Sequence, residues 1–318
     1  MKLQPRTRII LRALLFVSVV IFLALAFVKA YKQVPADQLH LHAGYLLLSL
    51  VFCLAFFFLQ AIGWWWAVRK LGSPMPLAPA LSTWFVSQIV KYVPGKVMLG
   101  LYRMVWAERV GVPKTRTVLS IMVELVLMVV SATLFFAALA PFLSRNLDDK
   151  YALYGVAFCC VAGLVVIHPR LLNFGVNFAL RVFKKPSIVI DFSYGSLIWM
   201  LLYFLASWLF YAVAAVFNVM AVTGSLPGGF DFAAAVAAGF AISWVLGFLS
   251  FLTPGGMGVR EAVLTVVLSP YLSVSVALIV AVVSRIIWMV GEVVGTGLMI
   301  HWRPRPLPDG DALEAQGE

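Results

Sequence analysis

Eight ionisable side chains lie within long apolar stretches of this sequence, where an uncompensated charge is costly. On insertion scales each costs roughly 2.5 to 3.5 kcal/mol at the centre of a bilayer, and eight unpaired groups would cost on the order of 20 kcal/mol. These side chains must therefore pair, face water or bind something. Five are cations and three are acids, so complete pairing leaves two cations for an anion such as a lipid phosphate. The eight residues are Lys91, Lys96, Arg103, Glu124, Arg260, Glu261, Arg285 and Glu292.

Two of the apolar stretches are broken by a proline-glycine pair. Pro94-Gly95 interrupts residues 81–107, and Pro254-Gly255 interrupts residues 232–268. The arm from 97 to 107 forms a helix of about 16 Å at ~1.5 Å per residue, which reaches only the middle of a ~30 Å hydrocarbon core. Each break therefore predicts a re-entrant hairpin, whose tip must be covered by protein or line a cavity. Such breaks at matching positions of two halves indicate a transporter's binding site.

Composition places the chain in a membrane. It is 63% hydrophobic and 12% charged, with a mean hydropathy of +1.00, which excludes a water-soluble fold and indicates an all-α polytopic membrane protein. The net charge of +11 does not require a nucleic-acid partner, because the basic residues cluster at the ends of apolar segments. The three cysteines lie in apolar runs. Of the four histidines, His40 and His42 stand together, but no second cluster of ligands completes a metal site. We therefore expect no metal site and no cofactor.

The apolar runs predict six full transmembrane helices beside the two hairpins. With the N-terminus inside, fifteen Lys and Arg residues fall on the inner side, four fall outside and five are embedded. This bias predicts cytoplasmic N- and C-termini, with the two hairpins entering from opposite faces as an inverted repeat. The predicted helices are residues 9–28, 44–68, 117–140, 151–167, 196–222 and 273–300.

The same pattern predicts a single membrane domain over residues 1–302. Its half-repeats are approximately residues 44–167 and 196–300. The last segment, 303–318, is rich in proline and acidic residues and contains too little apolar surface to fold. We expect it to be a disordered cytoplasmic tail.

Two further segments predict contacts with the membrane surface. Three consecutive tryptophans at 64–66 stand beside Arg69 and Lys70, which is typical of an interfacial anchor. Residues 170–191 are basic, with apolar side chains at helical spacing. This stretch fits either a helix lying on the inner leaflet or a solvated positive loop.

Arg285 is the strongest single candidate for substrate contact. It stands twelve residues into a span of about 28, too far from either end for its side chain to reach water. Glu292 follows two turns later on the same helical face, and Glu124 occupies the corresponding place in the first half. Two interpretations remain open: Arg285 contacts substrate, or it makes a structural ion pair with Glu261 or Glu124.

The remaining charges also allow two interpretations. The long side chains of Lys91, Lys96 and Arg103 can reach the membrane surface, so interfacial anchoring competes with substrate contact. Arg260 and Glu261 begin a short helix after the second break, and the backbone amides of the glycines before it could receive an anion. The candidate substrate-binding residues are Pro94, Gly95, Lys96, Arg103, Glu124, Pro254, Gly255, Gly256, Gly258, Arg260, Glu261, Arg285 and Glu292.

Two motifs connect this sequence with a known family. One is the run Pro-Gly-Gly-Met-Gly-Val-Arg-Glu at 254–261, followed by Arg285. The other is the run Tyr-Val-Pro-Gly-Lys at 92–96, followed by Arg103 and Glu124. Over nearly the whole chain up to about residue 300, the sequence resembles the flippase-like membrane family that includes the transmembrane region of lysylphosphatidylglycerol synthases. The resemblance implies movement of a lipid or lipid-linked headgroup across the bacterial inner membrane.

The expected function is therefore a flippase-like lipid transporter. Its substrate would be an anionic phospholipid, an aminoacylated lipid or a polyprenyl-linked glycolipid, moved between leaflets by alternating access of the two halves. Synthases of the family carry a soluble aminoacyl-transferase domain after this region, and this sequence carries none, so we do not expect an enzyme. The alternatives are a membrane-embedded envelope glycosyltransferase, which needs carboxylates exposed in the cavity, and a non-transporting accessory subunit. The expected protein partner is a glycosyltransferase or another envelope-biosynthesis enzyme.

Overall fold

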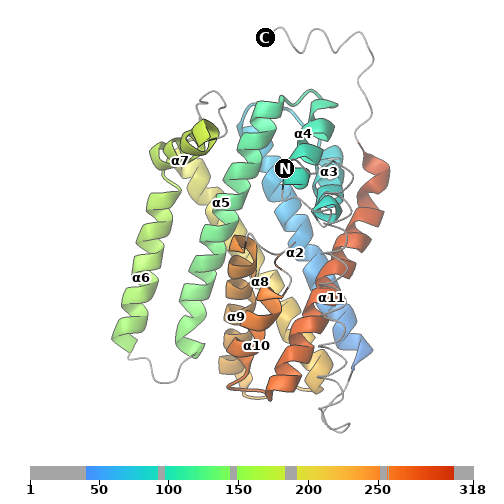
Figure 1. Cartoon of the computed structure of the whole chain (residues 1–318), viewed down its shortest axis with the longest axis vertical. Helices are drawn as coiled ribbons and strands as arrows, with labels where there is room; N and C mark the ends of the chain where they lie inside the picture. The colour runs from blue at the N-terminus through green and yellow to red at the C-terminus, as the bar shows by residue number, and fades with distance from the viewer. Residues whose placement is uncertain are drawn as a thin grey trace, which may run out of the picture.

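The computed structural model describes residues 41–91, 97–143, 149–182, 192–250, 256 and 258–303. All regular elements within these ranges are helices (Figure 1). The predicted helix at 9–28, the first break at Pro94-Gly95 and the second break at Pro254-Gly255 lie outside the described residues, as does the tail beyond residue 303.

Five helices have the length and composition of a membrane span. Four of them confirm predicted spans: α2 (Ala43–Lys70), α5 (Lys114–Leu139, extended by the 3-10 turn η2, Ala140–Leu143), α8 (Tyr194–Thr223) and α11 (Val274–Met299, followed by the 3-10 turn η4, Ile300–Trp302). The fifth is α9 (Gly229–Leu249), which the sequence analysis assigned to the first arm of a hairpin. Its 21 residues run unbroken, so it is longer than a half-membrane arm.

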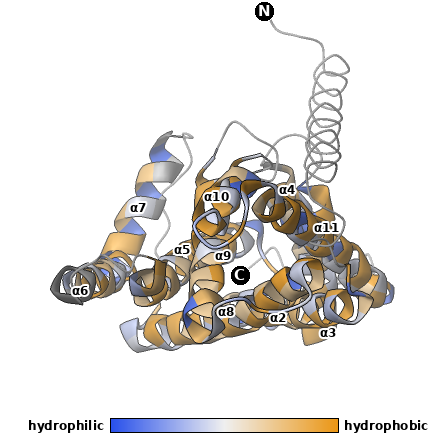
Figure 2. Cartoon of the chain, turned by 90° about the horizontal axis from the view of Figure 1, so that it is seen from below, coloured by the Kyte–Doolittle hydropathy of each residue, from blue (hydrophilic) through white to orange (hydrophobic). Residues whose placement is uncertain are grey.

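A bent pair of helices stands at one side of the molecule. α6 (Asp149–Val166) and α7 (Pro169–Val182) meet at an angle of 70°, and together they have the length and composition of one further span. Both views place the pair beside α5 and away from α2, α3 and α11 (Figures 1 and 2). α7 exposes Phe174 and Phe178. The basic stretch therefore contains the amphipathic helix that was one of its two interpretations.

Two hairpins, each with at least one short helix, complete the fold. The first pairs α3 (Leu77–Val90) with α4 (Val97–Glu108), and the second pairs α9 with α10 (Val259–Leu268). The α3–α4 pair lies at one end of the long helices and the α9–α10 pair lies towards the other end (Figure 1). The twelve residues of α4 agree with the short arm that was predicted from the position of the break.

Local signals in the sequence set the helix ends. Ser193 and Ser273 cap α8 and α11 by accepting hydrogen bonds from the backbone amides of the first turn. α8 stops at Gly224, whose φ of +75° is the left-handed conformation that glycine adopts without strain. At the start of α10 the backbone N–H of Gly258 donates to the carboxylate of Glu261 at 2.6 Å. Glu261 therefore caps its own helix.

The helices pack in a reciprocal pattern. α2 packs along α8; α5 packs on α9 while α11 packs on α3; and α5 contacts α8 while α11 contacts α2. Close approach of α3 and α11 depends on Gly295, because a Cβ there would lie 2.2 Å from the ring of Phe85. The main contacts of one hairpin with the long helices thus have counterparts at the other hairpin, and α2, α5 and α11 contribute to the wall of the space between the hairpins.

Candidate functional site

The predicted cavity lies between the two hairpins. It holds about 980 Å³ of space, part of it open to the outside, and is lined from α2, α3, α4, α5, α9, α10 and α11; we call it the main cavity. One set of lining side chains is charged or carries an amide, and these groups come from both halves of the chain. They are Gln60, Gln88, Lys91, Arg103, Glu124 and Arg260.

Aromatic rings form most of the remaining wall. They are Phe56, Phe57, Trp84, Trp244, Phe248 and Trp288. The rings contact one another, as at Trp244 and Phe248, which stack at 5.4 Å with nearly parallel planes. An apolar cavity with a few convergent polar groups is the usual form of a small-molecule site. The wall therefore offers apolar contact area, and the ionised groups offer orientation.

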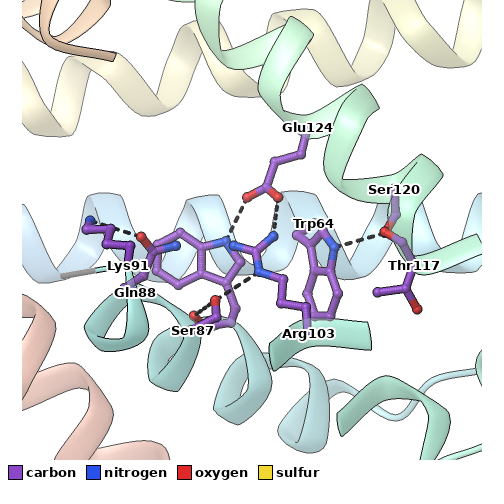
Figure 3. Close-up of polar contacts among 9 residues, drawn as sticks. Trp64, Ser87, Gln88, Lys91, Arg103, Thr117, Ser120 and Glu124 are labelled. Atoms are coloured by element: carbon purple, nitrogen blue, oxygen red, sulfur yellow. Dashed lines mark hydrogen bonds and ion pairs between the residues drawn. The ribbon is translucent and has the colours of Figure 1, made fainter. Parts of the chain in front are cut away.

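The centre of the first half is a buried ion pair between Arg103 of α4 and Glu124 of α5. The guanidinium Nη1 contacts one carboxylate oxygen, and the indole N–H of Trp84 donates to the other at 2.7 Å (Figure 3). Arg103 is only 1% exposed and Glu124 only 2%. The proposed reach of Arg103 to the membrane surface is therefore wrong, because its charge is satisfied inside the protein.

Two neighbours hold the Arg103 side chain in place. Its Nε–H donates to Ser87 Oγ at 2.9 Å, and Ser87 in turn donates to the backbone carbonyl of Trp84 at 2.6 Å. The guanidinium also lies over the ring of Trp64, 4.8 Å from its centroid (Figure 3). Trp64 is fully buried and donates to Ser120 Oγ, so it is part of the site's support and the prediction of an interfacial anchor is wrong for this residue.

A second ion pair joins the two halves of the chain. Lys91, at the end of α3, contacts the carboxylate of Glu292 on α11, and the indole N–H of Trp288 donates to the same oxygen at 2.6 Å. Gln88 Oε1 accepts from Lys91 at 3.1 Å. Glu292 is fully buried, while the Lys91 side chain is 20% exposed and faces the main cavity. Lys91 is therefore held inside the protein, and anchoring at the membrane surface does not describe it.

Arg260 of α10 lies against aromatic rings. Its guanidinium is 5.8 Å from the ring centroid of Trp244 and 5.2 Å from that of Trp288. The stem of Arg260 passes over Gly247 of α9, where a Cβ would lie 2.3 Å from its Cγ. Glycine at this position thus allows the cation to reach the cavity wall while its stem is packed between α9 and α10.

Gly247 also supports the end of the second break. Gly256 has a φ of +71°, and a Cβ on it would lie 2.5 Å from the backbone oxygen of Gly247. Two glycine backbones therefore touch at this point, which no larger residue would permit. Gly256 lines the main cavity, so the described end of the second break reaches the same space as Lys91 and Arg103.

Arg285 faces a smaller neighbouring space. Its Nε lies 3.8 Å from a carboxylate oxygen of Glu261, and both side chains line a second cavity, a space of about 280 Å³ that is partly open to the outside. Arg260 and Trp288 line both cavities and so form the wall between them. The ion pair of Arg285 with Glu261, one of its two interpretations, is therefore present, and contact of Arg285 with substrate stays a prediction.

The structure thus brings most of the described candidates together and divides them into two groups. Arg103, Glu124, Gly256 and Arg260 line the main cavity. Glu261 and Arg285 line the second cavity, and Glu292 forms an ion pair with Lys91. Gly258 begins α10 beside Glu261. The candidates Pro94, Gly95, Lys96, Pro254 and Gly255 lie outside the described residues.

Sequence reasoning overlooked the aromatic and amide side chains of the site. Trp84, Trp244 and Trp288 stand in the middle of apolar helices, whereas tryptophan in membrane proteins is enriched at the ends of spans. Gln60 and Gln88 are amides within apolar runs. Both signals could have been recognised in the sequence, because a polar group within an apolar helix needs a hydrogen-bond partner.

Across the parts of the chain that the structure describes, no group of three or more His, Cys, Asp and Glu side chains could hold a metal ion.

Comparison with known proteins identifies one matching family. The family model described as the lysylphosphatidylglycerol synthase TM region matches residues 9–294. A search of curated proteins found no match. The matched range contains both hairpins and all the residues of the two cavities.

Proposed function

The chain belongs to the family of the lysylphosphatidylglycerol synthase transmembrane region, and from this premise we propose that it is a lipid flippase-like transporter of the bacterial inner membrane. The observation that carries the proposal is the main cavity, where cations from both hairpins meet aromatic walls. An anionic headgroup would enter this cavity while the acyl or prenyl tail stays in the bilayer. The headgroup would then be shielded from hydrocarbon during its passage between leaflets.

The proposal includes an inverted repeat with two re-entrant hairpins. Its support is the reciprocal packing, in which α2 to α5 correspond to α8 to α11. The two hairpins lie towards opposite ends of the long helices (Figure 1). Transporters built this way bind substrate where the repeats meet and open alternately to each side by rocking of the halves. With the charge bias of the loops, both chain termini would be cytoplasmic.

Charge pairing favours transport over a membrane-embedded glycosyltransferase. Such an enzyme needs a carboxylate available in the cavity to act on its substrate. Glu124, Glu261 and Glu292 each lie in an ion pair within the protein. We therefore propose that the ion pairs stabilise the site and that its cationic and aromatic groups contact the substrate.

A transport assay with a matched pair of arginine variants tests the proposal. The purified full-length chain is reconstituted into phosphatidylcholine vesicles with a trace of fluorescent phosphatidylglycerol, and dithionite quenches the label that reaches the outer leaflet. We expect the wild type to expose label from both leaflets. Arg260→Gln removes a cavity cation stacked on tryptophan and should slow transfer roughly tenfold or more, since hydrogen bonds to charged groups contribute ~1.5–3 kcal/mol.

Arg69→Gln is the control, because it also removes an arginine stacked on a tryptophan. Arg69 is exposed at the end of α2, 4.9 Å from the ring of Trp65, and does not line the main cavity. Its transfer rate should equal that of the wild type. Transfer that is absent in folded wild-type protein, both for phosphatidylglycerol and for a labelled polyprenyl phosphate, would contradict the proposal and favour an accessory subunit.

A further inference from the structure

Gln60 carries a buried acceptor, its amide oxygen, in the wall of the main cavity. It lies within α2, is fully buried and lines the cavity. Its amide nitrogen donates to Ser207 Oγ at 2.9 Å, and Ser207 uses its single proton on the carbonyl of Phe204 at 2.6 Å. Ser207 can therefore only accept from Gln60, which fixes the amide with its nitrogen towards Ser207 and its oxygen away from it.

The amide oxygen of Gln60 has no hydrogen-bond partner among the described residues. Two of the cationic donors that line the main cavity already have acceptors. Arg103 donates to Glu124 and Ser87, and Lys91 donates to Glu292 and Gln88. A buried acceptor without a partner is costly, so this position favours a ligand that carries a hydrogen-bond donor.

The charge of the site limits what that donor can be. The described lining residues include the cations Lys91, Arg103 and Arg260 and the acid Glu124. Adding Glu292, which pairs with Lys91, leaves this described set with a net charge of +1. A positively charged amino headgroup would meet a net positive site whose carboxylates are engaged. A hydroxyl supplies the donor without adding charge.

We infer that the lipid carried by the main cavity has a singly charged phosphodiester linked to a neutral hydroxylated group, a polyol or a sugar, and that Gln60 accepts a hydrogen bond from one of its hydroxyls. This inference rests on the proposed function and narrows its substrate class. The phosphodiester pairs with the cavity cations, and the carbon faces of the hydroxylated group lie against the rings of Trp84 and Trp288. Lipids with an aminoacylated, cationic headgroup are selected against.

Three lipid probes separate charge from hydroxyl recognition. Short-chain phosphatidylglycerol carries one negative charge and hydroxyls, phosphatidylethanol carries the same charge without a hydroxyl, and lysylphosphatidylglycerol carries a net positive charge. Affinities of the full-length chain in detergent are measured by native mass spectrometry. We expect phosphatidylglycerol to bind roughly tenfold tighter than phosphatidylethanol, and lysylphosphatidylglycerol to bind weakest.

Variants of Gln60 then assign the hydroxyl contact. Gln60→Leu should remove the difference between phosphatidylglycerol and phosphatidylethanol, while Gln60→Glu lowers the site charge by one and should improve binding of the lysyl lipid. Asn173→Leu, an amide replaced on α7 outside the cavity, should leave all three affinities unchanged. Thermal unfolding of each variant checks that it is folded.

The outcomes distinguish this inference from the proposed function. Equal binding of phosphatidylglycerol and phosphatidylethanol by the wild type, or tighter binding of the lysyl lipid, overturns the inference and leaves lipid transport standing. A hydroxyl preference that survives in folded Gln60→Leu also overturns it. Failure of all three lipids to bind also overturns the inference, and transfer of the labelled polyprenyl phosphate then decides the proposed function.

Discussion

The ion pair of Arg103 and Glu124 allows a quantitative test of how this fold tolerates charge. Both side chains are almost completely buried, and they join α4 to α5. Arg103→Met leaves the Glu124 carboxylate buried with the indole N–H of Trp84 as a hydrogen-bond donor but without its cation, which should cost about 3–5 kcal/mol of stability. Replacing both partners, with Glu124→Leu added, removes the stranded charge. The double variant should lie within about 1.5 kcal/mol of the wild type or be more stable.

An exposed ion pair between the same two helices supplies the control. Lys114 and Glu108 lie 2.8 Å apart, with side chains 59% and 46% exposed. Lys114→Met should therefore change stability by only about 0–1 kcal/mol. The assay is unfolding by sodium dodecyl sulfate in mixed micelles, followed by tryptophan fluorescence.

The reasoning is refuted if the double variant is as unstable as Arg103→Met, because the loss would then come from packing and not from an uncompensated charge. It is equally refuted if the buried and exposed pairs give similar losses. The double variant also separates stability from function: we expect it to remain folded and to transfer lipid more slowly than the wild type, since a cavity cation has gone.

Two further changes test other parts of the site. Gly256→Ala places a Cβ at a residue with positive φ, 2.5 Å from the Gly247 oxygen, and should destabilise the protein by more than about 1 kcal/mol. Gly100→Ala, in α4 with open space around it, should stabilise the protein by about 0.5–1 kcal/mol. Thermal unfolding compares the two variants, and equal shifts would contradict the packing described for the second break. Lys91→Met leaves the buried carboxylate of Glu292 without its cation and should cost about 3–5 kcal/mol of stability. Adding Glu292→Gln should restore most of this stability in the same measurement. A double variant no more stable than Lys91→Met would show that the two groups are not coupled.

Much of the fold was readable from the sequence. The approximate bounds of α2, α5, α8 and α11 follow from long apolar runs, and the short α4 follows from the position of the break before it. Pro113, Ser193 and Ser273 precede α5, α8 and α11. The extent of α9 was not read correctly. Its apolar residues continue without interruption from Gly229, so composition alone does not distinguish a full span from the arm of a hairpin.

The candidate site was predicted as a set of charges but not as a set of contacts. The cost of buried charge showed that the ionised residues must be paired or bound, and the family membership agrees with the motifs that contain them. The sequence did not predict which of these residues lines which cavity. Arg285 was ranked first, yet it faces the second cavity, while Arg260 lies on the wall that both cavities share.

By itself the sequence determined that the protein lies in a membrane, where its helices break and which side chains carry charge at depth, because these properties depend on local composition and on the cost of burying ions. Only the tertiary structure decided the partners. Lys91 meets Glu292 across 201 positions, and Gln60 turns its amide nitrogen to Ser207, 147 positions away, because Ser207 can only accept. Such pairings depend on how each helix is rotated and packed against its neighbours, and that rotation is set by contacts between residues far apart in the chain.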